Sequence, residues 1–260
     1  MKNLSQFRQS ISFLLTDIDD TLTDEGQLHA DAYAALWTLH NAGIQVIPIT
    51  GRPAGWCEMI ARQWPVAAIV GENGGFYFRY HNKKMQRFFY FDEKTQQANR
   101  AKLNLIQSQV EKEIPAAGIA SDQFCRLMDL AIDFCEDVPA LPESQVEQIV
   151  KIFKQHGAQA KVSSIHVNGW FGDYNKLSMT LTLLEKEFHV SAEEAKAVCA
   201  FSGDSPNDEP MFEYFPNSFA VANIQNFITK IQHKPSYVSS STGGRGFVEI
   251  SQALLKNHQK

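Results

Sequence analysis

The strongest indication of the fold is an alternation of short apolar runs with helical patterns. Residues 11–15 are apolar and β-prone, 29–43 carry apolar side chains at helical spacing, and 44–50 form a β-branched run. A second helix is expected over 53–63, and another apolar run follows at 67–71. Strands that alternate with helices in this way form a parallel sheet with helices on both faces. The sequence therefore predicts an α/β fold.

The middle of the chain has a different pattern. Residues 76–91 are typical of an antiparallel hairpin that turns around 81–84, and a long polar helix is expected over 94–113. A helix over 143–156 then lies between β-prone stretches at 126–137 and 158–172, an arrangement typical of a smaller α+β unit.

The first pattern then resumes. The expected elements are a helix over 176–188, a strand over 197–204, a helix start within 206–215, a strand over 218–223, a helix over 224–232 and a strand over 236–240. We therefore predict a Rossmann-like core, residues 1–83 and 173–260, with a cap domain, residues 84–172, inserted between its two parts.

Composition excludes several classes of protein. The chain has 260 residues, 44% of them hydrophobic, which is ample for packed cores. A net charge of −5 without a basic block argues against binding to nucleic acid or to an anionic membrane surface. The four cysteines form no C-x-x-C pair, and Asp17 interrupts the first apolar run too early for a signal peptide. We expect a cytoplasmic protein without a membrane span, and the oligomeric state stays open.

Crowded carboxylates follow the first predicted strand. The stretch FLLTDIDDTLTDEG places Asp17, Asp19, Asp20 and Asp24 within eight positions. Carboxylates at a partly buried strand end repel one another unless a cation or hydrogen bonds compensate. A calcium loop is a poor alternative, because its glycine and glutamate positions hold Leu22 and Leu28. A solvated acidic turn is the other alternative.

Two further strand ends carry similar groups. The segment FSGDSPNDEP places Asp204, Asn207 and Asp208 directly after an apolar run. The segment IPITGR ends another strand with Thr50 and Gly51, whose hydroxyl and backbone amide suit a ligand oxyanion. Because open parallel sheets bind ligands at the carboxyl ends of their strands, we expect one site there.

The segments DIDDTLT, ITGR, DYNKLSMT and GDSPND, in this order, resemble the four motifs of the haloacid dehalogenase superfamily. The position of the insertion resembles the type IIB subgroup, which includes Cof-like, sucrose-phosphatase-like and mannosyl-3-phosphoglycerate-phosphatase-like members. The resemblance implies a phosphatase with a large cap over its active site.

The resemblance also implies roles for individual residues. Asp17 would be the nucleophile that forms an aspartyl-phosphate, and Asp19 the general acid and base. Lys176 would balance charge on Asp17 and on the transferred phosphoryl group. The resemblance assigns phosphate binding to Thr50 and the Gly51 amide. Arg52 and Asn207 are further candidates: Arg52 either reaches phosphate or pairs at the surface, and Asn207 contacts metal or phosphate.

Magnesium is the expected cofactor, because the motifs offer hard oxygen ligands and no nearby cysteine or histidine. The expected metal site consists of Asp17, the backbone carbonyl of Asp19, Asp204 and Asp208. In the cap, His166, Asn168 and Trp170 share one strand face by their period of two. That face either contacts substrate, through His166 and Asn168, or packs against a helix.

The sequence thus predicts a magnesium-dependent phosphatase that acts through an aspartyl-phosphate on a small phosphorylated metabolite, with a sugar phosphate as the expected substrate. The alternatives are a phosphomutase or other phosphotransferase, and a non-catalytic relative that binds a sugar phosphate. The sequence does not identify the metabolite, since no motif marks the specificity residues of the cap.

Overall fold

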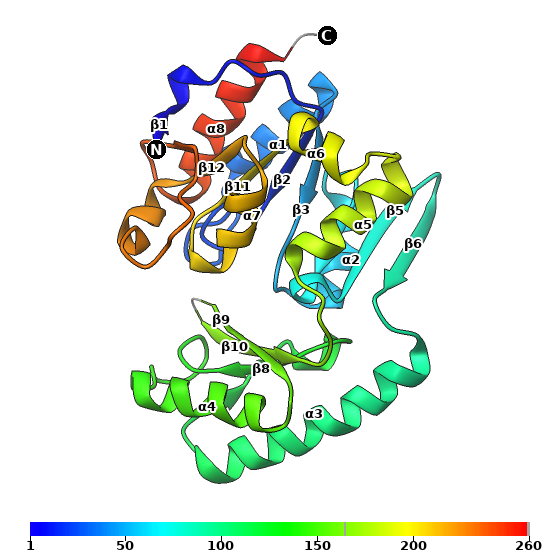
Figure 1. Cartoon of the computed structure of the whole chain (residues 1–260), viewed down its shortest axis with the longest axis vertical. Coiled ribbons are helices and arrows are strands. Elements are labelled where there is room, and N and C mark those ends of the chain that lie inside the picture. Colours follow the sequence, from blue (N-terminus) through cyan, green and yellow to red (C-terminus); the bar gives the residue numbers. More distant parts are fainter. Residues whose placement is uncertain (164, 259–260) are drawn as a thin grey trace.

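The computed structural model describes residues 1–163 and 165–258, and its centre is a parallel sheet of six strands (Figure 1). Every neighbouring pair in this sheet is parallel, which confirms the predicted α/β fold. In spatial order the strands are β1 (Lys2–Asn3), β13 (Tyr237–Val238), β12 (Ser218–Ala220), β11 (Cys199–Gly203), β2 (Phe13–Thr16) and β3 (Gln45–Pro48).

Both faces of this sheet are covered, because side chains alternate along each strand. Leu14 and Val46 belong to a core shared with α1 (Ala30–Ala42), α2 (Ala54–Gln63) and α8 (Gly243–Asn257). Leu15 and Ile47 point the other way, into a core shared with α5 (Lys176–Phe188), α6 (Ala192–Val198) and α7 (Glu209–Tyr214). The strands are therefore buried on both sides, as their continuous apolar runs predict.

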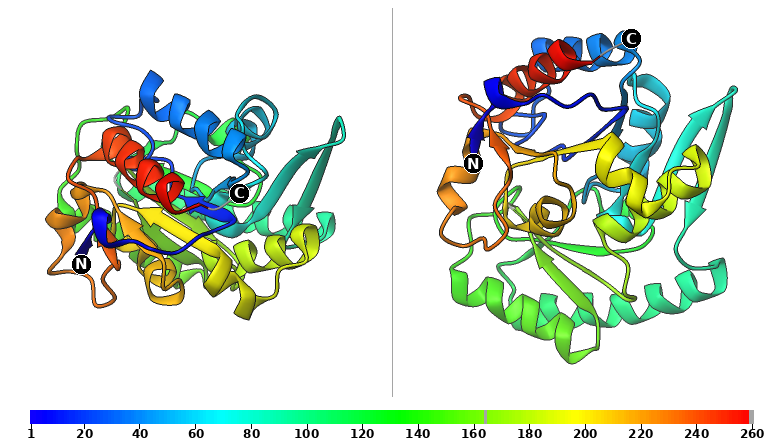
Figure 2. Two further views of the ribbon diagram at one scale, coloured as in Figure 1. Left: turned by 90° about the horizontal axis from the view of Figure 1, so that it is seen from above. Right: turned by 45° about the horizontal axis from the view of Figure 1, so that its top comes forward.

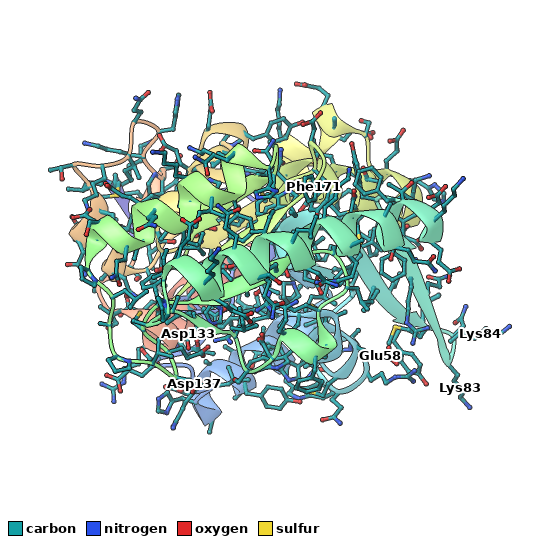
Figure 3. All side chains as sticks on the ribbon, turned by 90° about the horizontal axis from the view of Figure 1, so that it is seen from below. Glu58, Lys83, Lys84, Asp133, Asp137 and Phe171 are labelled. Carbon is teal, nitrogen blue, oxygen red and sulfur yellow. The ribbon has the colours of Figure 1, made fainter. Side chains whose placement is uncertain are left out.

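A small antiparallel sheet adjoins the core. It consists of β4 (Ile69–Gly71), β5 (Phe76–His81) and β6 (Lys84–Phe89), and a parallel bridge between Ile49 and Val70 connects it to the end of β3. Lys83 and Lys84 lie at the protruding tip of the β5–β6 hairpin (Figure 3). Asn82 and Lys83 both have positive φ, as the two-residue hairpin turn requires.

The cap lies against the carboxyl edge of the core sheet (Figures 1 and 2). It has a sheet in the order β7 (Gly118–Ile119), β8 (Leu130–Asp133), β10 (His166–Trp170) and β9 (Gln159–Val162). Helices α3 (Glu93–Glu113) and α4 (Glu143–Gln155) cover its outer face and share a third hydrophobic core with it. The other face of the cap sheet is turned toward the core, as Figure 1 shows.

The chain passes twice between core and cap. Strand β6 pairs along its whole length with β5 and therefore lies with the core. We propose that the chain first crosses to the cap at residues 90–92 and returns to the core at residues 171–175. These proposed crossings shorten the expected cap of residues 84–172 at its beginning. No helix among the described residues is long and apolar enough to cross a membrane.

Two elements differ from the expectations. The helix expected over 224–232 is replaced by a 3-10 turn, Ala222–Phe227, because Asn223 ties this segment to its neighbours. Its side-chain Nδ2 donates to the Asp20 carbonyl, and its Oδ1 accepts from the Gly243 amide. Helix α6 was not expected, although Ser191 and Glu194 form a capping box at its start.

Candidate active site

Asp17 and Asp204 meet at the carboxyl edge of the core sheet, as expected. They follow β2 and β11, which are neighbours in the sheet with Thr16 opposite Ser202. The Asp17 amide donates to the Ser202 carbonyl at 2.9 Å, so the pairing extends to the start of the acidic segment. Both aspartates are buried, at 5% and 6% exposure.

Asp208 joins them through the tight turn that follows β11. The Asp204 amide donates to its Oδ2 at 3.1 Å. A Cβ on Gly203 would lie 2.4 Å from the same oxygen, so a side chain at that position would displace the carboxylate. The glycine of the GDSPND motif thus makes room for its last aspartate.

Lys176 supplies the positive charge among these carboxylates. It is the first residue of α5, whose Asn175 cap fixes the helix start. Its Nζ lies 2.8 Å from Asp17 Oδ1 and 3.0 Å from Asp208 Oδ1. The two carboxylates raise the pKa of Lys176 against the opposing effect of burial, so the amine is charged. The expected lysine therefore lies where the motif order implies.

The acidic cluster suits a hard divalent cation. Carboxylate oxygens of Asp17, Asp204 and Asp208 lie within 4.8 Å of one another, and all three residues are buried. Burial raises the pKa of Asp17 to about 7, against the lowering effect of Lys176. One ammonium group leaves these three carboxylates under-compensated, and oxygen donors of this kind favour Mg²⁺. The donor set therefore fits the expected metal.

Thr50 and Gly51 lie at the end of β3, beside the acidic cluster. The Thr50 hydroxyl accepts from the Arg52 amide at 3.0 Å, and the Thr50 carbonyl accepts from the Asn73 amide. Gly51, Asn73 and Asn207 line the same cavity as Asp17. The side chain of Asn207 accepts from the Ser205 hydroxyl, which holds it at the cavity wall.

Arg52 connects the core with the cap. Its guanidinium donates to both oxygens of Asp19 at 2.9–3.1 Å. On its other side it lies 3.4 Å from Glu136 and 3.8 Å from Asp122, both in the cap, while the ring of Trp56 stacks on it at 4.5 Å. The residue expected to bind phosphate is thus paired with the expected general acid.

His166 and Asn168 lie on the cap face that is turned toward the core, and both line the cavity. His166 Nε2 lies 2.9 Å from Glu136 Oε2, although the ring is not aligned for a hydrogen bond. Asn168 donates to Asp129 at 3.0 Å. Trp170, on the same face, stacks on Tyr174 instead, so only part of this face reaches the cavity.

The cavity between core and cap has a volume of about 1060 Å³. Residues 14–110 match the sequence profile of the haloacid dehalogenase-like hydrolases. The motifs that the resemblance used meet in the structure at the floor of that cavity.

Over residues 14–110 the chain is similar to the haloacid dehalogenase-like hydrolases.

Proteins of similar fold and one curated relative match nearly the whole chain. A protein of Thermoplasma acidophilum has the same fold with a TM-score of 0.74 and 18% identity, covering 95% of this chain and 99% of its own. The sucrose-phosphatase of Synechocystis, solved with sucrose and phosphate, has a TM-score of 0.63 and 16% identity over 95% of this chain and 98% of its own. In sequence, a phosphoglycolate phosphatase of Methanobrevibacter smithii is 23% identical over 95% of this chain and 99% of its length.

Sequence reasoning missed the residues that hold the cap of this protein against its core. Arg126, in the cap, donates to the Gly51 carbonyl at 3.0 Å and is buried between Asp122 and Asp129. Nothing in the local sequence marks Arg126, because its partner Gly51 lies 75 positions away.

Glu72 is the second missed residue, and it lies fully buried in the GENGG segment. Its carboxylate accepts from the Ala54 amide, at the start of α2, and from the amides of Leu127, Met128 and Asp129 in the cap. The signal available in sequence was a lone acidic residue among glycines directly after an apolar strand.

The two remaining aspartates of the first motif are structural. Asp24 Oδ2 accepts from the Gly244 amide at the start of α8 at 3.1 Å. Asp20 has positive φ, and its carbonyl accepts from Asn223.

Proposed function

We propose that this hydrolase is a magnesium-dependent phosphatase that removes phosphate from a small metabolite, a sugar phosphate in the first instance. The observation that carries the proposal is the pairing of Lys176 with Asp17 and Asp208 at the base of a large polar cavity. Asp19, two residues beyond Asp17, lines the same cavity. These groups supply the parts that hydrolysis of a phosphate ester requires.

Each group has a distinct role in the proposed reaction. Asp17 attacks phosphorus in line with the leaving oxygen and forms an aspartyl-phosphate. Asp19 donates a proton to the leaving oxygen and then removes one from the water that hydrolyses the intermediate. Lys176 holds Asp17 in place, while Thr50 and the Gly51 amide bind the oxygens of the phosphoryl group.

Asp17, Asp204, Asp208 and the Asp19 carbonyl are the proposed ligands of Mg²⁺. Bound magnesium supplies a positive charge that offsets repulsion between the anionic nucleophile and the anionic phosphate. The same charge makes the dense carboxylate cluster compatible with folding.

The relatives support the reaction class and differ in substrate. One is named a phosphoglycolate phosphatase and another is a sucrose-phosphatase. Their low identity leaves the substrate of this chain to be argued from its own cavity.

The test is phosphate release from a panel of sugar phosphates and from p-nitrophenyl phosphate, with magnesium and with EDTA. Asp17→Asn is the matched control, since it keeps the shape of the side chain but removes the nucleophile. Stoichiometric release that needs magnesium and Asp17 supports the phosphatase. Transfer of phosphate to another hydroxyl without release would identify a phosphotransferase, and inactivity toward every ester would leave a binding protein.

A further inference from the structure

Two of the cations that line the cavity, Arg126 and Arg52, are already engaged by protein acceptors. Arg126 donates through Nε and Nη2 to Asp122, and through Nη1 to Asp129 and the Gly51 carbonyl. Its side chain is 1% exposed. Arg126 therefore has almost no donor left for a substrate carboxylate.

Arg52 is occupied in the same way from both sides. Asp19 accepts from its Nε and Nη2, and Glu136 accepts from its Nη1 at 3.4 Å. An arginine beside the phosphate loop is the natural partner for a carboxylate close to the leaving oxygen. Here Glu136 takes the guanidinium edge that points into the cap.

Glu136 also faces His166. The two side chains approach to 2.9 Å without the alignment of a hydrogen bond, and His166, which is 3% exposed, has no hydrogen-bond partner for its Nε2 among the described residues. Burial lowers the pKa of His166 to about 4, and the Arg126 guanidinium acts in the same direction. A neutral imidazole offers a substrate a hydrogen bond but no positive charge.

The position of Glu136 is fixed by the turn that carries it. Asp133, at the end of β8, accepts hydrogen bonds from the amides of Cys135, Glu136 and Asp137 at 2.7–2.9 Å. Figure 3 shows Asp133 and Asp137 at one end of the cap. Asp137, the next residue, is exposed like Glu136 but makes no such contact with Arg52 or His166, so it provides a control of equal charge.

We propose that Glu136 is a specificity-determining residue that excludes substrates with a carboxylate on the leaving group and favours uncharged, hydroxylated ones. It does so by engaging Nη1 of Arg52 and by placing its negative charge beside Arg52 and His166, the two neighbours that line the cavity. His166, Asn168 and Ser163 then offer neutral hydrogen-bonding groups to hydroxyls. The inference rests on the proposed phosphatase function and separates this chain from its phosphoglycolate phosphatase relative.

The test uses pairs of phosphate esters that differ only by a carboxylate in place of a hydroxymethyl group. Suitable pairs are phosphoglycolate with hydroxyethyl phosphate, and phosphoglycerate with glycerol phosphate. The wild-type protein should prefer the alcohol in each pair by on the order of tenfold in kcat/KM, the effect expected of one nearby like charge. Using the ratio within a pair cancels any general change in activity.

Glu136→Gln should reduce this preference by on the order of tenfold, mainly through a lower KM for the acid. Asp137→Asn removes the same charge one residue away and should leave the ratio unchanged. Raising the salt concentration should narrow the wild-type ratio and affect Glu136→Gln much less, because screening acts on charge and not on shape.

Each outcome has a distinct meaning. A wild-type preference for the acids, or a Glu136→Gln ratio equal to that of the wild type, would overturn the inference while leaving the phosphatase intact. Failure of the wild type to release phosphate even from p-nitrophenyl phosphate would instead refute the proposed function, and this inference with it. Circular dichroism of both variants establishes that they are folded.

Discussion

Replacing Lys176 by methionine should destabilise the fold strongly in the absence of metal. The lysine side chain is 9% exposed and is paired at 2.8 and 3.0 Å with two carboxylates that are 7% and 0% exposed. Methionine fills similar space, so the change removes the charge and leaves the packing largely intact. The predicted effect is therefore mainly electrostatic.

The magnitude follows from the burial of the partners. Removing one member of a buried ion pair costs about 3–5 kcal/mol, because the other member is left without compensation. Here two carboxylates lose their shared cation, and Asp204 lies within 4.8 Å of both. We expect a loss at the upper end of that range, about 4–5 kcal/mol, in EDTA.

Magnesium should restore a large part of this loss. A ligand at 100 times its Kd stabilises the folded state by about 2.7 kcal/mol, and removal of the competing ammonium should tighten binding of the metal in the variant. Urea unfolding followed by tryptophan fluorescence, in EDTA and in magnesium, measures both the loss of stability in the variant and its recovery by the metal. A loss below about 1 kcal/mol in EDTA, the scale of an exposed pair, would refute the reasoning.

Three further predictions concern other buried groups. His166→Gln should flatten the dependence of stability on pH. The pKa of His166 is about 4 in the native state and 6.5 in the unfolded state, so the wild type loses about 3 kcal/mol of unfolding free energy as pH falls from 6.5 to 4. An equal loss in the variant would contradict this. Glu72→Gln should lower the free energy of unfolding in urea by about 2–3 kcal/mol, because a glutamine amide cannot accept at both ends from four backbone donors. Glu58→Gln, whose side chain is 34% exposed, should lower it by under about 1 kcal/mol. Burial raises the pKa of Cys57 and raises that of Cys199 to about 12, so both thiols should resist iodoacetamide at pH 8 until urea unfolds the protein, as peptide mass spectrometry can measure.

The sequence predicts that the aspartates of the site meet at one edge of the sheet, because the signal for each of them is local. Asp17 and Asp204 directly follow apolar runs, and a parallel sheet brings such strand ends to one edge without further information. The register of β2 with β11 then places the two aspartates side by side. Lys176 was expected only from the resemblance of the motif order, since a lysine at the start of a helix is by itself no sign of a site.

The contacts between core and cap could not be predicted in this way. Glu72 lies 55 to 57 positions from the cap amides that it accepts from, and Arg52 lies 84 positions from Glu136. A charged residue on a loop looks the same in sequence whether it is solvated or buried against a distant partner. The face of β10 illustrates the limit: its period of two placed His166, Asn168 and Trp170 together, but the structure directs only the first two to the cavity.

Trapping the covalent intermediate tests the central claim most directly. In Asp19→Asn the proposed general base is lost, so an aspartyl-phosphate formed from p-nitrophenyl phosphate should accumulate. Acid quenching followed by peptide mass spectrometry should then find one phosphoryl group on Asp17, and none when Asp17 is also replaced by Asn. Release of p-nitrophenol by this variant with no phosphoryl group on Asp17 at any time point would contradict the account.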